Sequence, residues 1–189
     1  MAQSPRAASA LAVSACAVAL AAGAFADVTG CGCDLSRPEA MNARNCGLCR
    51  ATEQQPAGPA FFFLQDNNPR KPHRWLALPR FHGKGPHSLA DMSTAQRTAF
   101  WTAAMEKAQS LFGEQWGLAV NGDQARTQCH AHIHIGRLIP GVERDNFIVV
   151  RGPEQIPVPA GGAGLWVHPV NGKLHVHLGE QITETVLFK

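Results

Sequence analysis

Apolar residues recur along the chain with two different periods, which predict several β-strands and one long helix. Residues 93–112 carry apolar side chains at helical spacing, with Ser93 as a plausible N-cap and Gly113 as a stop. Runs and alternations typical of strands occur at residues 60–65, 73–78, 116–121 and 129–138. A turn at residues 66–69 joins the first two into a predicted hairpin. The central elements therefore follow the order β-β-α-β-β.

The pattern continues more weakly after Pro140. Short strands are predicted at residues 147–150, 164–168, 173–178 and 183–188. Asn171-Gly172 is a strong hairpin turn between two of them. The predicted fold class is α+β: an antiparallel β-sheet packed against one main helix, with an additional C-terminal β-hairpin.

The N-terminus has the pattern of a targeting segment. Arg6 is followed by an apolar run at residues 7–22 and by the small-x-small sequence Ala24-Phe25-Ala26. Residues 1–26 are therefore predicted to be a cleaved secretory signal, with an uncleaved N-terminal anchor as the alternative. Both alternatives place the folded part outside the cytosol.

The composition describes one globular unit after that segment. The chain has 189 residues, 45% of them hydrophobic and 16% charged, and a net charge of +3 that does not favour nucleic acid as a partner. Residues 27–59 are predicted to be a loop-rich arm with one short helix around residues 38–43. Residues 60–189 are predicted to form the main domain.

Export makes the cysteines informative. Four cluster in the arm at positions 31, 33, 46 and 49, and clustered cysteines in an oxidising compartment are usually disulfides. Four cysteines allow three pairings. The alternative is a zinc site, since Cys46-Gly-Leu-Cys49 has ligand spacing and His82 and His130 could complete it. Cys129 lies outside this cluster and is predicted to be a small buried apolar residue.

The histidines carry the chemistry. His130, His132 and His134 alternate, so a strand would point all three to one face, about 6.6 Å apart. Such a row can hold a phosphoryl group or bind a metal ion. His175 and His177 form a second alternating pair, expected on a half-exposed strand, with a metal or substrate role as the alternative.

Residues 60–138 resemble the histidine-triad superfamily of nucleotide hydrolases and transferases. The resemblance lies in His130-Ala-His132-Ile-His134-Ile135-Gly136, in the strand around His73, and in the strand ending at Asn121. It implies a histidine-triad fold for residues 60–189, with a C-terminal β extension. Because members of the superfamily are often dimers, the resemblance also leaves a homodimer open.

A closer likeness is to bacterial CDP-diacylglycerol diphosphatases. Residues 126–135 read Arg-Thr-Gln-Cys-His-Ala-His-Ile-His-Ile, similar to the string of that family. Those proteins lie at the periplasmic side of the inner membrane and carry two cysteines with the spacing of Cys33 and Cys46. The likeness therefore implies a periplasmic or secreted protein, in contact with a membrane surface, and disulfides Cys33–Cys46 and Cys31–Cys49. This chain is shorter after the triad, so the lipid-binding elements are expected to differ.

The resemblance assigns roles to individual residues. His132 would be the nucleophile that attacks phosphorus, through a nucleotidyl-histidine intermediate. His130 and His134 would orient the centre and bind phosphate oxygens, and His73 would flank the leaving phosphate. Substrate-binding roles fall on Arg126, Thr127, Gln128 and Asn121. The chemistry requires no metal and no other cofactor.

Three functions follow as hypotheses. The first is an exported hydrolase that cleaves CDP-diacylglycerol to CMP and phosphatidate. The second is a periplasmic histidine-triad hydrolase of soluble nucleotide diphosphates or phosphoramidates. The third is a secreted metal-binding protein that uses its HxH and CxxC motifs. The substrate partner is accordingly a lipid-linked or a soluble nucleotide diphosphate.

Overall fold

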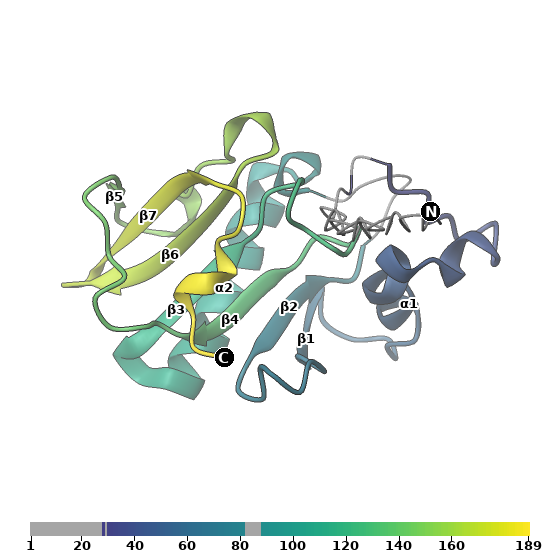
Figure 1. Cartoon of the computed structure of the whole chain (residues 1–189), viewed down its shortest axis with the longest axis horizontal. Coiled ribbons are helices and arrows are strands. Elements are labelled where there is room, and N and C mark those ends of the chain that lie inside the picture. The colour runs from purple at the N-terminus through teal and green to yellow at the C-terminus, as the bar shows by residue number, and fades with distance from the viewer. Residues whose placement is uncertain (1–27, 29, 82–87) are drawn as a thin grey trace, which may run out of the picture.

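The chain forms one antiparallel sheet of seven strands in the order β1-β2-β4-β3-β6-β7-β5 (Figure 1). This computed structural model describes residues 28, 30–81 and 88–189. The strands are β1 (Phe61–Gln65), β2 (Trp75–Pro79), β3 (Trp116–Val120), β4 (Ile133–Arg137), β5 (Ile148–Val150), β6 (Gly164–Val170) and β7 (Lys173–Glu180). The predicted α+β class with an antiparallel sheet is confirmed.

Within the described residues, two α-helices accompany the sheet. The long helix α2 (Thr94–Phe112) starts at a capping box between Ser93 and Gln96 and ends at Gly113, whose φ of 55° suits glycine. The short helix α1 (Gly47–Glu53) lies in the arm and was not predicted. Among the described residues, no helix has the length and apolar character needed to cross a membrane. The signal or anchor predicted for residues 1–26, and the loop with His82, lie outside the described residues.

Strand periodicity gives the sheet two different faces. Side chains such as Ile133, Ile135, Leu118 and Val167 belong to the main core with α2. Their neighbours in sequence, including His134, point to the opposite face, because successive strand residues alternate. On that face, Leu76 packs with β1 near α1.

The hairpins predicted from sequence are present. Strands β1 and β2 pair antiparallel, and β6 pairs with β7 through a turn in which Asn171 and Gly172 have φ of 50° and 73°. The C-terminal hairpin is an integral part of the sheet, because β6 also pairs with β3.

Two local predictions are wrong. The strand predicted at 129–138 covers only Ile133–Arg137, so His130 and His132 precede it. Residues 183–188 form a 3-10 turn, Glu184–Val186, with one isolated bridge between Leu138 and Leu187. The short helix expected around residues 38–43 is present as a 3-10 helix, Ala40–Asn42.

The C-terminal segment crosses the sheet over a pair of glycines. Gly117 and Gly136 are cross-strand partners, and a Cβ at Gly117 would lie 2.5 Å from Cδ2 of Leu187. The guanidinium of Arg74 donates to the backbone oxygens of Glu184, Leu187 and Phe188 at 2.6–2.7 Å. Tertiary contacts of this kind replace the predicted last strand.

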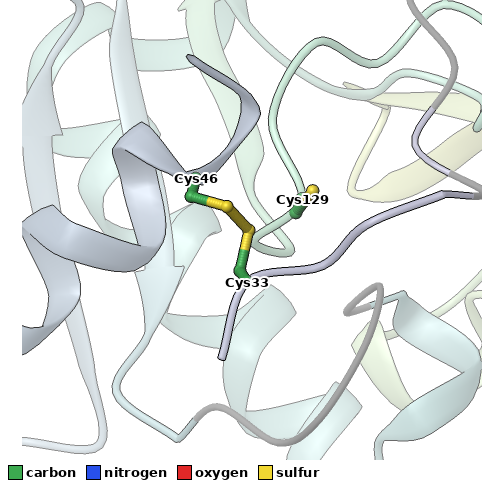
Figure 2. A group of neighbouring side chains, drawn as sticks. All are labelled: Cys33, Cys46 and Cys129. Atoms are coloured by element: carbon green, nitrogen blue, oxygen red, sulfur yellow. A yellow bond between two sulfur atoms is a disulfide. The ribbon is translucent and has the colours of Figure 1, made fainter. Parts of the chain in front are cut away.

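Two disulfides fix the arm, and Figure 2 shows one of them, Cys33–Cys46, with Cys129 nearby. The Cys33–Cys46 bond is present as expected. The expected Cys31–Cys49 bond is wrong: Cys31 is bonded to Cys129, and Cys49 is a free, fully buried cysteine. Cys129 is therefore not the isolated apolar residue that was predicted. Because Cys46 is in a disulfide, it is unavailable for the zinc site considered as the alternative.

The arm packs against the loop that precedes the triad. The backbone N–H of Cys129 donates to the oxygen of Asn45 at 2.8 Å, and Gln128 binds the backbone of Leu48 and Arg44 through its amide. Both the covalent and the hydrogen-bonded links hold residues 128–129 in place, directly before His130. The arm thus supports the segment from which the histidines emerge.

Candidate active site

The three histidines of the triad occupy different environments. His134 lies within β4, on the face away from α2, while His130 and His132 lie in the extended segment before it. The rings of His132 and His134 are close, with centroids 4.9 Å apart. The alternation in sequence therefore brings two of the rings together.

His130 is a buried anchor. Its Nε2 lies 2.8 Å from the backbone oxygen of Pro79, at the end of β2, and 3.3 Å from Oγ1 of Thr52 in α1. Because the hydroxyl of Thr52 already donates to the oxygen of Leu48, Nε2–H of His130 is the donor in both contacts. With this nitrogen committed to the scaffold, His130 joins the arm, β2 and the triad segment.

His132 has the arrangement of a nitrogen nucleophile. Its Nδ1 lies 2.7 Å from the backbone oxygen of His130, so Nδ1 carries the proton and donates. The Nε2 atom then keeps its lone pair. Burial, and to a smaller extent the cation of Arg126, lower the pKa of His132 to about 4 against the opposing hydrogen bond to His130. The ring is therefore neutral at pH 7.

His134 is held by Asn121. The Nδ2 amide of Asn121 lies 3.5 Å from Nε2 of His134. The Oδ1 atom of Asn121 accepts from the backbone N–H groups of Thr183 and Glu184 at 2.9 and 3.1 Å, which fixes the direction of the amide. Burial lowers the pKa of His134 well below its usual value, as does His132 beside it.

An acidic residue that sequence reasoning missed stands beside the triad. Glu184 Oε2 lies 3.5 Å from Nδ1 of His134 and 3.3 Å from Nη1 of Arg74, and it binds Nζ of Lys71. Burial opposes its ionisation, but the interactions with His134, Lys71 and Arg74 lower the pKa of Glu184 to about 2. Nothing in the local sequence indicates this cluster, because Arg74 and Glu184 are 110 positions apart.

Two cavities meet at His132 and Asn121. The smaller one, about 230 Å³, is bordered by Arg126, by Leu89 and by the segment around Gly162. The larger one, about 670 Å³, also includes His134, and its cationic wall residues are Arg44, Arg50 and Lys71. A ligand that spans both cavities would place its centre at His132.

The predicted substrate-binding residues divide between the site and the scaffold. Arg126 is 3% exposed, borders the smaller cavity and binds Oδ1 of Asp123 at 2.9 Å. Thr127 is exposed at the wall of the larger cavity. Gln128 also borders that cavity, but both ends of its amide bind the arm backbone. Gln128 is therefore a structural clamp in this arrangement.

His73 is not brought to the site. It is exposed in the turn before β2 and borders neither cavity. Its neighbours Lys71 and Arg74 turn inward instead and bind Glu184. The signal that could have indicated this is the cluster of cations at residues 70–74 next to a buried strand.

The geometry allows chemistry on an anionic ester or anhydride. It combines a neutral imidazole with a fixed tautomer, a buried guanidinium and two adjoining cavities. No protein-family model matches the chain.

Proposed function

We propose that the protein is a hydrolase of nucleotide diphosphates that works through a histidine-bound intermediate, as histidine-triad enzymes do. The observation that carries the proposal is the 2.7 Å hydrogen bond from Nδ1 of His132 to the oxygen of His130. It fixes the tautomer that leaves Nε2 free for attack, at the place where two cavities meet.

The reaction takes place in two steps. Nε2 of His132 attacks the nucleotide α-phosphorus; an N–P bond forms, the anhydride P–O bond breaks, and the leaving phosphate takes the electron pair. A water molecule then attacks the same phosphorus and loses a proton, the N–P bond breaks, and the nucleoside monophosphate leaves. Nδ1 keeps its proton throughout, and its hydrogen bond to the His130 carbonyl stabilises the positive charge on the ring.

Cations around His132 support this chemistry. Arg126 borders the smaller cavity, buried and tied to Asp123, so its guanidinium is oriented before a substrate arrives. A preorganised cation stabilises charge that develops on phosphorus oxygens in the transition state. Arg44 and Arg50 border the larger cavity and add attraction for a diphosphate.

CDP-diacylglycerol is the substrate we favour, cleaved to CMP and phosphatidate. Support comes from the resemblance of residues 126–135 to the CDP-diacylglycerol diphosphatases. The two disulfides support the export that this function requires, since disulfides persist in oxidising compartments. The proposal includes a histidine-triad fold, a periplasmic or secreted location and contact with a membrane surface.

A soluble nucleotide diphosphate is the second candidate substrate. The observation in its favour is the polar wall of the larger cavity, which includes Gln65, Asp66, Asn67 and Asn68. Phe61 and Phe63, by contrast, are partly buried and pack against the main core.

The test compares the lipid-linked nucleotide diphosphate with soluble ones. Release of CMP from CDP-diacylglycerol in detergent is measured beside CDP-choline and ADP-ribose, with and without EDTA. Higher kcat/KM for the lipid, unchanged by the chelator, is expected. Equal or higher kcat/KM for CDP-choline would move the substrate to the soluble class, and release of no monophosphate from any of them would contradict the proposed function.

A further inference from the structure

A second group of histidines lies on the same face of the sheet as His134. Cross-strand pairing runs from His134 to Ala119, then to Trp166, then to His177 on β7. His168 and His175 form the adjacent cross-strand pair. Three strand spacings correspond to about 14 Å, so this group is separate from the triad.

Two of these histidines are buried with nitrogens that have no hydrogen-bond partner. Both ring nitrogens of His177, and Nε2 of His168, make no hydrogen bond within the part of the chain that the structure describes. The two side chains are 1% and 4% exposed. Buried polar atoms are normally satisfied, and each exception indicates a role or a missing partner.

Glu143 reaches the same place from the loop between β4 and β5. Its Oε1 lies 3.5 Å from Nε2 of His168 and also contacts Nδ1 of His175. Each of Glu143, His168 and His177 places one ligand atom within 4.8 Å of the others. Ligand atoms on one tetrahedral zinc ion, at about 2.0–2.1 Å from the metal, lie roughly 3.3 Å apart. The 3.5 Å between Oε1 of Glu143 and Nε2 of His168 is close to that value.

We propose that Glu143, His168 and His177 form a binding site for a divalent transition metal ion of the zinc class. Two imidazoles and one carboxylate are a donor set that zinc prefers, and three protein ligands leave the fourth position open. His175 contacts Oε1 of Glu143 through its Nδ1 and would hold that carboxylate in position.

Aromatic rings stacked on the histidines hold the imidazoles in place. The ring of His177 is stacked on Trp166, with centroids 3.5 Å apart and planes at 2°, which holds the imidazole in one orientation. Phe147 stacks on His175 and shields it.

Other charges near the group do not replace the metal. Glu180 accepts from Nε1 of Trp166 and pairs with Arg144, so its carboxylate is already engaged. The contact between His175 and Glu143 is an ordinary ion pair. It does not explain why the buried ring nitrogens of His177 and Nε2 of His168 make no hydrogen bond among the described residues. A metal ion bound by Glu143, His168 and His177 would provide the missing partner for these nitrogens.

The test uses the tag-free mature protein, treated with EDTA and titrated with Zn²⁺. One equivalent of bound zinc by elemental analysis and a Kd of about 1 µM or below are expected. Glu143→Gln, which alters an exposed side chain, should weaken binding at least about tenfold, and His168→Ala should abolish it. Bound Co²⁺ should quench the fluorescence of Trp166, an effect that is absent in Trp166→Phe.

Two matched variants locate the site. His132→Ala changes the triad and His73→Ala changes an exposed histidine; both should keep one zinc with unchanged affinity. Equal affinity in the unaltered protein and in Glu143→Gln, loss of binding in His132→Ala, or a Kd above about 1 mM in the unaltered protein would each overturn the proposal. This experiment measures metal binding and not hydrolysis, so its outcome does not depend on whether the proposed hydrolase function is correct.

Discussion

Cys129, which immediately precedes His130, is bonded to Cys31, 98 positions earlier in the chain. The disulfide therefore attaches the arm to the residue from which the triad segment starts. The segment between Cys129 and β4 has no strand pairing of its own, so its position depends on such links. Covalent attachment here connects the stability of the arm with the geometry of His132.

The double variant Cys31→Ser/Cys129→Ser should lose stability and activity together. Removing a disulfide from a small exported domain costs about 2–5 kcal/mol in free energy of unfolding. Urea unfolding measures the loss, and kcat measures the displacement of His132. Cys49→Ala, which removes a free buried thiol, is the control and should keep kcat; a loss below about 1 kcal/mol in the double variant would contradict the structural role.

His132→Ala should abolish turnover with the fold intact. Loss of a covalent nucleophile lowers kcat by a factor on the order of 10⁴ or more. His73→Ala should keep the rate, since His73 is exposed and borders neither cavity. Hydrolysis rates and circular dichroism of both variants provide the check. Partial recovery of His132→Gly by added imidazole would identify the missing group as a nitrogen nucleophile, and an active His132→Ala protein would refute the assignment.

The pH dependence of kcat/KM should report the low pKa of His132. The nucleophile must be neutral, and its pKa is lowered to about 4. Activity should therefore fall only as the pH drops through about 4, while an ordinary histidine would lose its neutral form near 6.5. A pH profile from 3 to 8 measures this, and an acid limb at about pH 6.5 would show that a different group controls the reaction.

Arg126→Gln should slow the reaction by about 10²–10³-fold, because a preorganised cation at the transition state is removed. The same cation contributes to the low pKa of His132, so the acid limb should also move to higher pH. Arg37→Gln, at an exposed arginine of the arm, is the control. An unchanged rate would mean that Arg126 does not act on the substrate and only binds Asp123.

Glu184→Gln should destabilise the protein in a pH-dependent manner. Glu184 binds Arg74 and Lys71, and the loss of one partner of a partly buried pair costs roughly 1–3 kcal/mol here. Because the folded-state pKa of Glu184 is lowered to about 2 from 4.5, its contribution is present above pH 4.5 and disappears as the pH falls toward 2.

Free energies of unfolding measured between pH 2 and pH 7 check this prediction. The difference between the unaltered protein and Glu184→Gln should shrink across that window. Glu106→Gln, at an exposed position of α2, should show no such difference. A difference that stays constant from pH 7 to pH 2 would mean that the carboxylate charge does not stabilise the fold.

Local pattern determined most of the secondary structure. Helix α2 follows from its apolar spacing and from the caps at Ser93 and Gly113, and the β6–β7 turn follows from Asn171-Gly172. These signals lie within a few residues of one another, so they act whatever the rest of the chain does. His132, His134, Asn121 and Arg126 were also predicted together from sequence, and the structure places all four at the two cavities.

Contacts between distant segments decided the rest. The Cys31–Cys129 bond, the binding of Glu184 to Arg74 and the bonds from Asn121 to residues 183 and 184 join positions 62–110 apart. Residues 183–188 were predicted to form a strand, but they lie across the glycine pair Gly117 and Gly136, where Arg74 binds their carbonyl groups. The sequence by itself determined most of the elements and the placing of His132 next to His134. Only the tertiary structure decided which cysteines pair and which cations and acids surround the histidines, because those choices depend on which chain segments meet in space.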